Sequence, residues 1–131
     1  MKELIEEITA DIQKAYTEGV TMEEAEKLAA KFLYAQIQFG DALKKADLNA
    51  RMRKTGVKAV KAAIYLEEVR KADKKPSDVL LGAIVDSNDL VTGEQEGFDT
   101  AEVERGSLDN MLQVARDGHI YFRGIAKGRF E

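Results

Sequence analysis

Apolar residues recur at helical spacing along almost the whole chain, and no stretch between turn signals alternates apolar and polar residues as a half-buried strand would. The first apolar stripe predicts a helix over residues 1–19 that ends at Gly19. Thr21 then precedes Glu24 by three residues, which is the spacing of a helix-capping box. The pattern predicts an all-α fold.

Two longer stripes follow, each with alternating spacings of three and four residues. They predict one long helix over 21–73 and another over 77–123, separated by a turn at Pro76, where Ser77 or the Asp that follows caps the second helix. Because the connection is short, the two helices are expected to fold back as an antiparallel, coiled-coil-like hairpin. In the inferred register, Val60 lies beside Val91 and Phe32 lies opposite His119, and a register shifted by one heptad is the alternative.

Several glycines interrupt these stripes. Gly56 is a possible break in the first long helix, and Gly93 with Gly97 leaves the continuity of the second undecided. Gly118 is a candidate for the start of fraying, and residues 124–131 are expected to form a loose tail.

Some positions do not fit a simple two-helix seam. Charged residues at seam positions are expected to lean outward on a partly exposed seam rather than form a site; they are Arg53, Glu67, Glu94 and Arg105. Apolar residues outside the seam still need burial, which predicts self-association as a dimer or a ring. They are Leu33, Tyr34, Ile37, Ala63, Tyr65, Leu66, Val103, Met111, Val114 and Tyr121.

Length and composition narrow the class of protein. A chain of 131 residues is expected to form a single helical domain, residues 1–131, and the absence of Cys excludes disulfides and thiolate chemistry. No apolar run approaches 18 residues, and the first residues are charged and amphipathic rather than a secretory signal. We therefore expect a cytoplasmic protein with no membrane partner.

Candidate catalytic and metal motifs are incomplete. The run Asp86-Ser-Asn-Asp89 starts like a calcium loop but continues with Leu90 and Val91, and the run from Gly124 to Gly128 lacks the Lys-Ser/Thr ending of a phosphate loop. The only histidine, His119, has no second ligand at di-iron spacing. We expect no catalytic residue, no metal and no cofactor, and hence no enzyme; an enzyme whose acids gather only in an oligomer is the weakest alternative.

Charge is distributed unequally along the chain, whose net charge is −4. Residues 44–75 contain eleven basic and four acidic residues, a formal +7, whereas residues 86–109 contain eight acids and one base, a formal −7. Either the two segments neutralise each other across the hairpin, or they form separate basic and acidic faces; the sequence favours neither.

The basic segment has a helical pattern. Lys44, Arg51 and Lys58 are seven residues apart, and Lys54 and Lys61 repeat the same spacing three residues further round. Such a row can follow a nucleic-acid backbone and release its counterions. Tyr65, Tyr121 and Phe122 are candidate stacking platforms for single strands, and salt bridges to the acidic stripe of a neighbouring subunit are the alternative.

The chain resembles the small helical recombination mediators of T4-type phages, the UvsY-like proteins. The resemblance covers roughly residues 10–125 and lies in size, heptad character, the basic run from Leu43 to Lys54, a Lys-Pro-Ser turn and a following acidic helix. It implies a homo-oligomer that binds single-stranded DNA and helps to load a recombinase onto strands covered by single-strand-binding protein. The phosphate contacts that it implies are Lys44, Lys45, Arg51, Arg53, Lys54, Lys58 and Lys61.

Two functions therefore stay open. The first is a non-enzymatic, homo-oligomeric accessory protein that binds single-stranded nucleic acid. The second is a helical protein–protein scaffold or adaptor with no nucleic-acid role, in which the basic and acidic faces dock onto each other or onto another protein.

Overall fold

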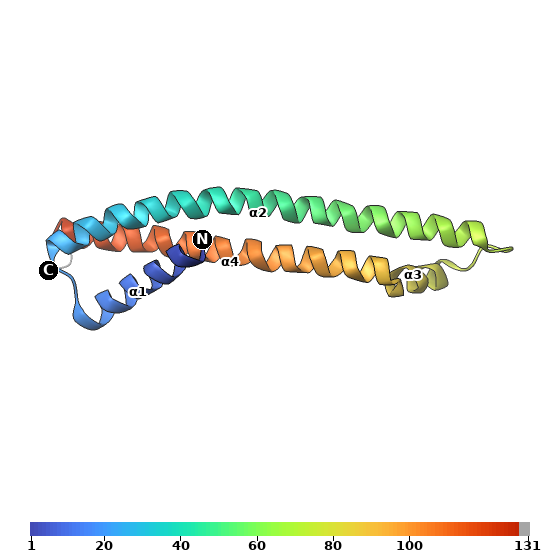
Figure 1. The fold of residues 1–131 in the computed structure, drawn as a ribbon, viewed down its shortest axis with the longest axis horizontal. Helices are drawn as coiled ribbons and strands as arrows, with labels where there is room; N and C mark the ends of the chain where they lie inside the picture. Colours follow the sequence, from blue (N-terminus) through green and yellow to red (C-terminus); the bar gives the residue numbers. More distant parts are fainter. Residues whose placement is uncertain (129–131) are drawn as a thin grey trace. The chain divides into compact units, whose positions relative to one another are not determined.

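The computed structural model, which describes residues 1–128, contains four helices and no strand in that range (Figure 1). They are α1 (Lys2–Glu18), α2 (Met22–Lys71), α3 (Asp78–Ser87) and α4 (Asp89–Ala126). The predicted all-α class, with a short N-terminal helix before an antiparallel pair of long helices, is confirmed.

The chain forms two compact units. The first combines Met1–Lys44 with Gly106–Glu131, and the second is Lys45–Arg105. In each unit, a segment of α2 packs against an antiparallel segment of α4, because the apolar stripes of both helices carry the small and aromatic residues that are buried there. The first unit also contains α1, and the second contains α3.

Aromatic packing fills the first unit. The rings of Phe32 and Phe122 meet edge to face with centroids 5.1 Å apart, and both side chains are fully buried. Next to them, the Nδ1 atom of His119 lies 2.9 Å from the carbonyl oxygen of Ala29, at hydrogen-bonding distance. The histidine is therefore part of the packing between α2 and α4.

Within the first unit, α1 is held by one buried side chain and by two ion pairs of Lys31. Ile8 is the buried residue of α1 and is fully enclosed. The ammonium group of Lys31 on α2 lies 2.7 Å from Oδ2 of Asp11 and 3.8 Å from a carboxylate oxygen of Glu7. These contacts fix the acidic helix α1 against α2.

Because of the contact of Lys31 with Asp11, the first unit is expected to lose stability at alkaline pH. The hydrogen bond to Asp11, with the charges of Asp11 and Glu7, raises the pKa of Lys31 above its ordinary value of 10.5. A raised pKa in the folded state means that the stabilisation is fully present below pH 10.5 and is lost as the pH rises through the folded-state pKa. We expect Lys31→Met to lower the free energy of unfolding by up to about 1 kcal/mol at pH 7 and to have a smaller effect near pH 12. Urea titrations of both proteins at the two pH values measure this difference, and an equal effect at both would contradict it.

The second unit has an aliphatic core. Ile64 of α2, Val85 of α3 and Val91 of α4 form one buried cluster, against which Val60 packs. The predicted proximity of Val60 and Val91 is confirmed. Two contacts show that α2 and α4 run antiparallel in this unit. The Arg53 side chain reaches Gly97, and three residues later on α2, Gly56 is reached by the side chain of Glu94, three residues earlier on α4.

Both predicted helix starts are confirmed. The hydroxyl oxygen of Thr21 accepts a hydrogen bond from the backbone N–H of Glu24 at 3.1 Å, and the same hydroxyl lies 3.2 Å from Glu24 Oε1. At α3, the hydroxyl oxygen of Ser77 accepts from the N–H of Leu80 at 3.2 Å. Each bond satisfies an amide that the first turn of a helix leaves without a helical partner.

The prediction of one continuous helix over 77–123 is wrong. The helix is interrupted at Asn88, whose backbone is extended (φ −67°, ψ 133°) and whose side-chain oxygen accepts from the N–H of Leu90 at 2.9 Å. Asn88 thereby ends α3 and starts α4. Helix α4 continues through Gly93 and Gly97, and α2 continues through Gly56, so none of these glycines breaks a helix.

The helix ends also differ from the predicted bounds. Helix α2 begins at Met22 and ends at Lys71, not at residue 73. Helix α4 extends to Ala126, so residues 124–126 of the predicted loose tail are helical, while residues 129–131 of that tail lie outside the described residues. Gly118 does not start fraying: it lies within α4, where Phe32 packs directly against it.

Candidate nucleic-acid interface

The seven predicted phosphate contacts all lie on α2, but they do not share one side of it. Lys44 is the last residue of the first unit's α2 segment, and the other six belong to the second unit. Four of them recur at intervals of three, four and three residues, which places them on one side of a helix with 3.6 residues per turn. We call these four the basic ridge: Arg51, Lys54, Lys58 and Lys61.

The basic ridge borders the buried seam of the second unit. Ala50, Val57 and Ile64 mark that seam, with exposed fractions of 7% or less. The ridge spans eleven residues, and the ten steps from Arg51 to Lys61 cover about 15 Å along the helix axis at 1.5 Å per residue. Arg51, Lys54 and Lys58 are exposed and Lys61 is half-buried, so the charges line an accessible edge of the unit.

Ion pairs compensate two of the four cations. Arg51 lies 3.0 Å from Asp47, one turn before it on α2, and Lys61 lies 3.6 Å from Asp86 of α3. In contrast, no carboxylate among residues 1–128 lies within 4 Å of the ammonium groups of Lys54 and Lys58. These two positive charges, on successive turns, are therefore open to an anion from outside.

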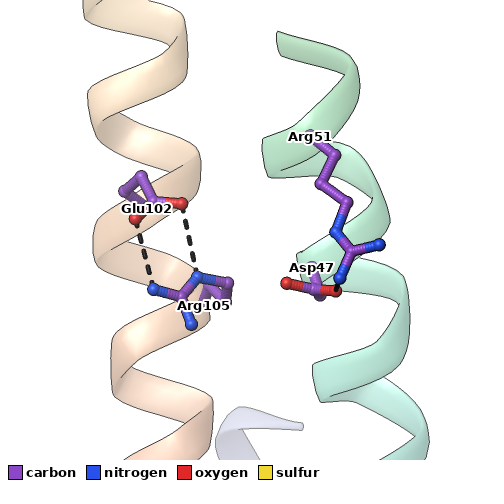
Figure 2. Close-up of polar contacts among 4 residues, drawn as sticks. All are labelled: Asp47, Arg51, Glu102 and Arg105. Carbon is purple, nitrogen blue, oxygen red and sulfur yellow. Dashed lines mark hydrogen bonds and ion pairs between the residues drawn. The ribbon is translucent and has the colours of Figure 1, made fainter. Parts of the chain in front are cut away.

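The acidic segment does not neutralise the basic one salt bridge by salt bridge. Figure 2 shows two ion pairs that each stay within one helix, Asp47 with Arg51 on α2 and Glu102 with Arg105 on α4. The Arg105 guanidinium also makes two hydrogen bonds to the Glu102 carboxylate, at 3.2 and 3.3 Å. The pair of Lys61 with Asp86 is a salt bridge that does connect the basic and acidic segments in the second unit.

Two of the seven candidates point elsewhere. The Arg53 side chain lies across α4, where its guanidinium would contact a Cβ atom at Gly97 (3.2 Å). Three residues further along α2, a Cβ atom at Gly56 would lie 3.3 Å from the carboxylate oxygen Oε2 of Glu94. Lys45 is exposed on the side of α2 that faces away from the seam. Whether these two residues touch phosphate remains a prediction that rests on the resemblance.

The polar seam residues behave as expected. Within residues 1–128, no polar or charged residue is buried. Arg53 and Glu67 are exposed, while Glu94 and Arg105 are half-buried. The charges at seam positions therefore keep contact with solvent, and none of them forms an enclosed site.

One of the three candidate stacking residues is accessible on the second unit. Tyr65 follows Lys61 by four residues, on the side of α2 that carries the basic ridge, and is 36% exposed. Phe122 is 2% exposed and packs against Phe32, so its prediction as a stacking platform is wrong. Tyr121 is 52% exposed but belongs to the first unit, where its ring packs against Phe122.

Among residues 1–128, no group of three or more His, Asp or Glu side chains is arranged to hold a metal ion. In the same range, no helix is both long and apolar enough to cross a bilayer.

The sequence matches no protein-family model, and comparison with curated proteins and with solved structures gives no match.

Proposed function

We propose that this chain is a non-enzymatic, homo-oligomeric accessory protein that binds single-stranded nucleic acid along the basic ridge. The observation that carries the proposal is the pair of Lys54 and Lys58, two exposed cations on successive turns with no carboxylate partner among residues 1–128. Arg51 and Lys61 extend the row, although each has an acidic neighbour to compete with phosphate.

Binding in this proposal is electrostatic. Phosphates replace the counterions of the ridge, and the release of ions from the strand drives association at low salt. Tyr65, on the same side of α2, adds a surface on which one base can stack. One ridge of four charges binds weakly, so several copies on one strand are needed for tight binding, through a higher effective concentration.

The resemblance to phage recombination mediators supplies the biological setting of the proposal. In that setting the strand is single-stranded DNA in the cytoplasm of a bacterial or phage-infected cell. The protein partners are a recombinase or a single-strand-binding protein, which the oligomer helps to exchange on the strand.

A second function, a protein–protein scaffold, is favoured by a different observation. The second unit exposes large apolar side chains away from its core, among them Leu66 at 66% and Val79 at 86%. Such residues mark protein contacts when they cluster. A scaffold needs those contacts and does not need the ridge.

The proposal predicts that reversing the two unpaired charges abolishes binding. We expect Lys54→Glu with Lys58→Glu to weaken binding to a labelled single-stranded oligonucleotide by roughly 100-fold at low salt, because two attractive contacts become repulsive. For the unaltered protein, the logarithm of the association constant is expected to fall with the logarithm of salt concentration with a slope of about −3 for four contacts. Fluorescence anisotropy at several salt concentrations measures both quantities.

A matched control separates the ridge from net charge. Lys2→Glu with Lys14→Glu changes the net charge by the same amount at two exposed positions of α1 and should bind like the unaltered protein. Equal losses in both variants, or no binding by the unaltered protein at low salt, would reject the ridge as the binding site and leave the scaffold function. Circular dichroism of all three proteins confirms that the helices are intact.

A further inference from the structure

The outer surface of α2 in the second unit is apolar although it faces away from the core. Leu48, Met52 and Leu66 are 60%, 65% and 66% exposed, and their helical positions lie opposite the buried seam. A cation stands at each end of this row, Lys45 before it and Arg70 after it, both exposed and without a carboxylate within 4 Å among residues 1–128. We call these five residues the outer α2 face.

Exposed apolar side chains also lie on α3 and on the first turn of α4, and the charged residues next to them in sequence are acidic. Val79, Leu80 and Leu90 are 86%, 52% and 67% exposed. Asp78 and Asp89 are their acidic sequence neighbours. The carboxylate of Asp78 is 87% exposed and forms a long ion pair of 3.9 Å with Lys75, and Asp89 makes no ion pair within residues 1–128. We call these five residues the α3 face.

Charge decides which surfaces can pair. Two outer α2 faces related by a twofold axis would place Lys45 next to the partner's Arg70 in an antiparallel arrangement, and next to the partner's Lys45 in a parallel one. Both arrangements bring like charges together beside an apolar contact, which is unfavourable where water is excluded. The α3 face offers the same apolar character with carboxylates in place of cations. Asp78 and Asp89 are 11 residues apart in sequence, whereas Lys45 and Arg70 are 25 residues apart on one helix, so the α3 face covers only one end of the outer α2 face. The end with Lys45, where Leu48 and Met52 lie one turn apart, is the complementary surface.

We propose that the α3 face of one copy of this chain docks on the outer α2 face of a second copy. The proposal deepens the proposed function, on whose homo-oligomeric state it rests, by naming the contact between copies. Because the two surfaces differ, the contact is head-to-tail, and its repetition gives a ring if the rotation closes and a filament if it does not.

The proposed contact leaves the basic ridge accessible. At about 100° per residue, the outer α2 face and the ridge are separated by roughly a third of a turn around α2. A second copy on the outer face therefore does not cover Lys54 and Lys58. Self-association and nucleic-acid binding can accordingly be tested separately.

Complementary variants test the head-to-tail contact. Met52→Glu with Leu66→Glu destroys the outer α2 face and leaves the α3 face intact, and Val79→Lys with Leu90→Lys does the reverse. We expect each variant alone to be monomeric, and an equimolar mixture to form a dimer and nothing larger, because only one functional pair of faces remains. Light scattering coupled to gel filtration, without nucleic acid, measures the masses.

The control exchanges apolar residues for acids elsewhere. Tyr16→Glu with Val103→Glu alters two side chains that are 90% and 73% exposed, and it should self-associate like the unaltered protein. A monomeric unaltered protein, a mixture that stays monomeric, or a Val79/Leu90 variant that associates normally would each overturn the contact. Short oligonucleotides that fit one ridge should bind the Met52/Leu66 variant normally, so loss of self-association and loss of the proposed function are read out independently.

Cross-linking gives a second measurement that does not depend on disrupting a face. The chain has no cysteine, so Met52→Cys and Val79→Cys each introduce a single reactive thiol. With a flexible bismaleimide, we expect abundant cross-linked dimers when the two variants are mixed and few with either alone. Equally efficient cross-linking of Met52→Cys alone would show that two outer α2 faces meet, and would overturn the proposal.

Discussion

Gly118→Ala is expected to lower the free energy of unfolding of the first unit by about 2 kcal/mol, even though alanine favours helices more than glycine does. A Cβ atom at this position would overlap the ring of Phe32, and that ring is fully buried and fixed edge to face against Phe122. Overpacking of this kind costs typically about 1–3 kcal/mol or more, which exceeds the gain in helix propensity of about 1 kcal/mol. Urea denaturation followed by circular dichroism measures the loss.

Another glycine of α4 provides the matched control. Gly93 is also helical, and an added Cβ atom would meet no atom within 4 Å, so Gly93→Ala should stabilise the protein by up to about 1 kcal/mol. A double-mutant cycle isolates the contact with the ring: in a Phe32→Ala background, Gly118→Ala should change from destabilising to neutral or stabilising. If Gly118→Ala is equally destabilising without the ring, overlap with Phe32 is not the cause.

The periodic part of this fold could be predicted from the sequence because the signal is local. Alternating steps of three and four residues mark the side of each helix that is buried, and Pro76 removes a helical option from its neighbour whatever the rest of the chain does. The pairing of Val60 with Val91 then followed from counting residues on both sides of the turn. The structure places Val60 against the cluster that contains Val91.

Features that depend on the opposite helix could not be predicted in this way. Gly118 has the local character of a weak helix position, and only the large side chain facing it explains why no Cβ is tolerated. Asn88 lies in a stretch whose apolar spacing fits an uninterrupted helix. An asparagine side chain can either point into solvent from a continuous helix or cap a new helix by accepting a backbone hydrogen bond, and here it caps α4. The burial of Phe122 is different, because it could have been predicted from local spacing: Phe122 follows Ala115 by seven residues on the apolar repeat of the second long helix.

The candidate site also has one part that could be predicted from the sequence, the positions of its cations, and one part that could not, their ion pairs. Helical spacing alone groups Lys54 with Lys58 on one side of α2 and separates Arg53 from them. Which cations keep a free charge could not be predicted, because the partner of Lys61 is Asp86, near the end of a helix whose separate existence depends on the break at Asn88. The charge available to a ligand is thus set by nonlocal structure, although its position on the helix is set by sequence.

Ile8→Ala is expected to release α1 from the first unit while the contact of α2 with α4 in that unit persists. Ile8 is fully enclosed and is the buried residue of α1, and truncation of a buried isoleucine to alanine typically costs about 2–5 kcal/mol. The ion pair of Lys31 with Asp11 is partly exposed, so the contact that remains is worth about 1 kcal/mol or less. A detached helix of 17 residues is marginal in water, so α1 should lose its helical hydrogen bonds as well as its position.

Hydrogen exchange read by mass spectrometry distinguishes local release from general loss of stability. Peptides from α1 should exchange rapidly in Ile8→Ala, whereas peptides around Phe32 and Phe122 keep most of their protection because their edge-to-face contact does not involve α1. Ile12→Ala is the matched control: Ile12 lies one turn further along the same apolar stripe but is 37% exposed, so its truncation should cost about 1 kcal/mol and leave α1 bound. If Ile8→Ala instead lowers protection around Phe32 and Phe122 as much as in α1, then α1 is part of a single cooperative core in the first unit and is not a separately attached helix.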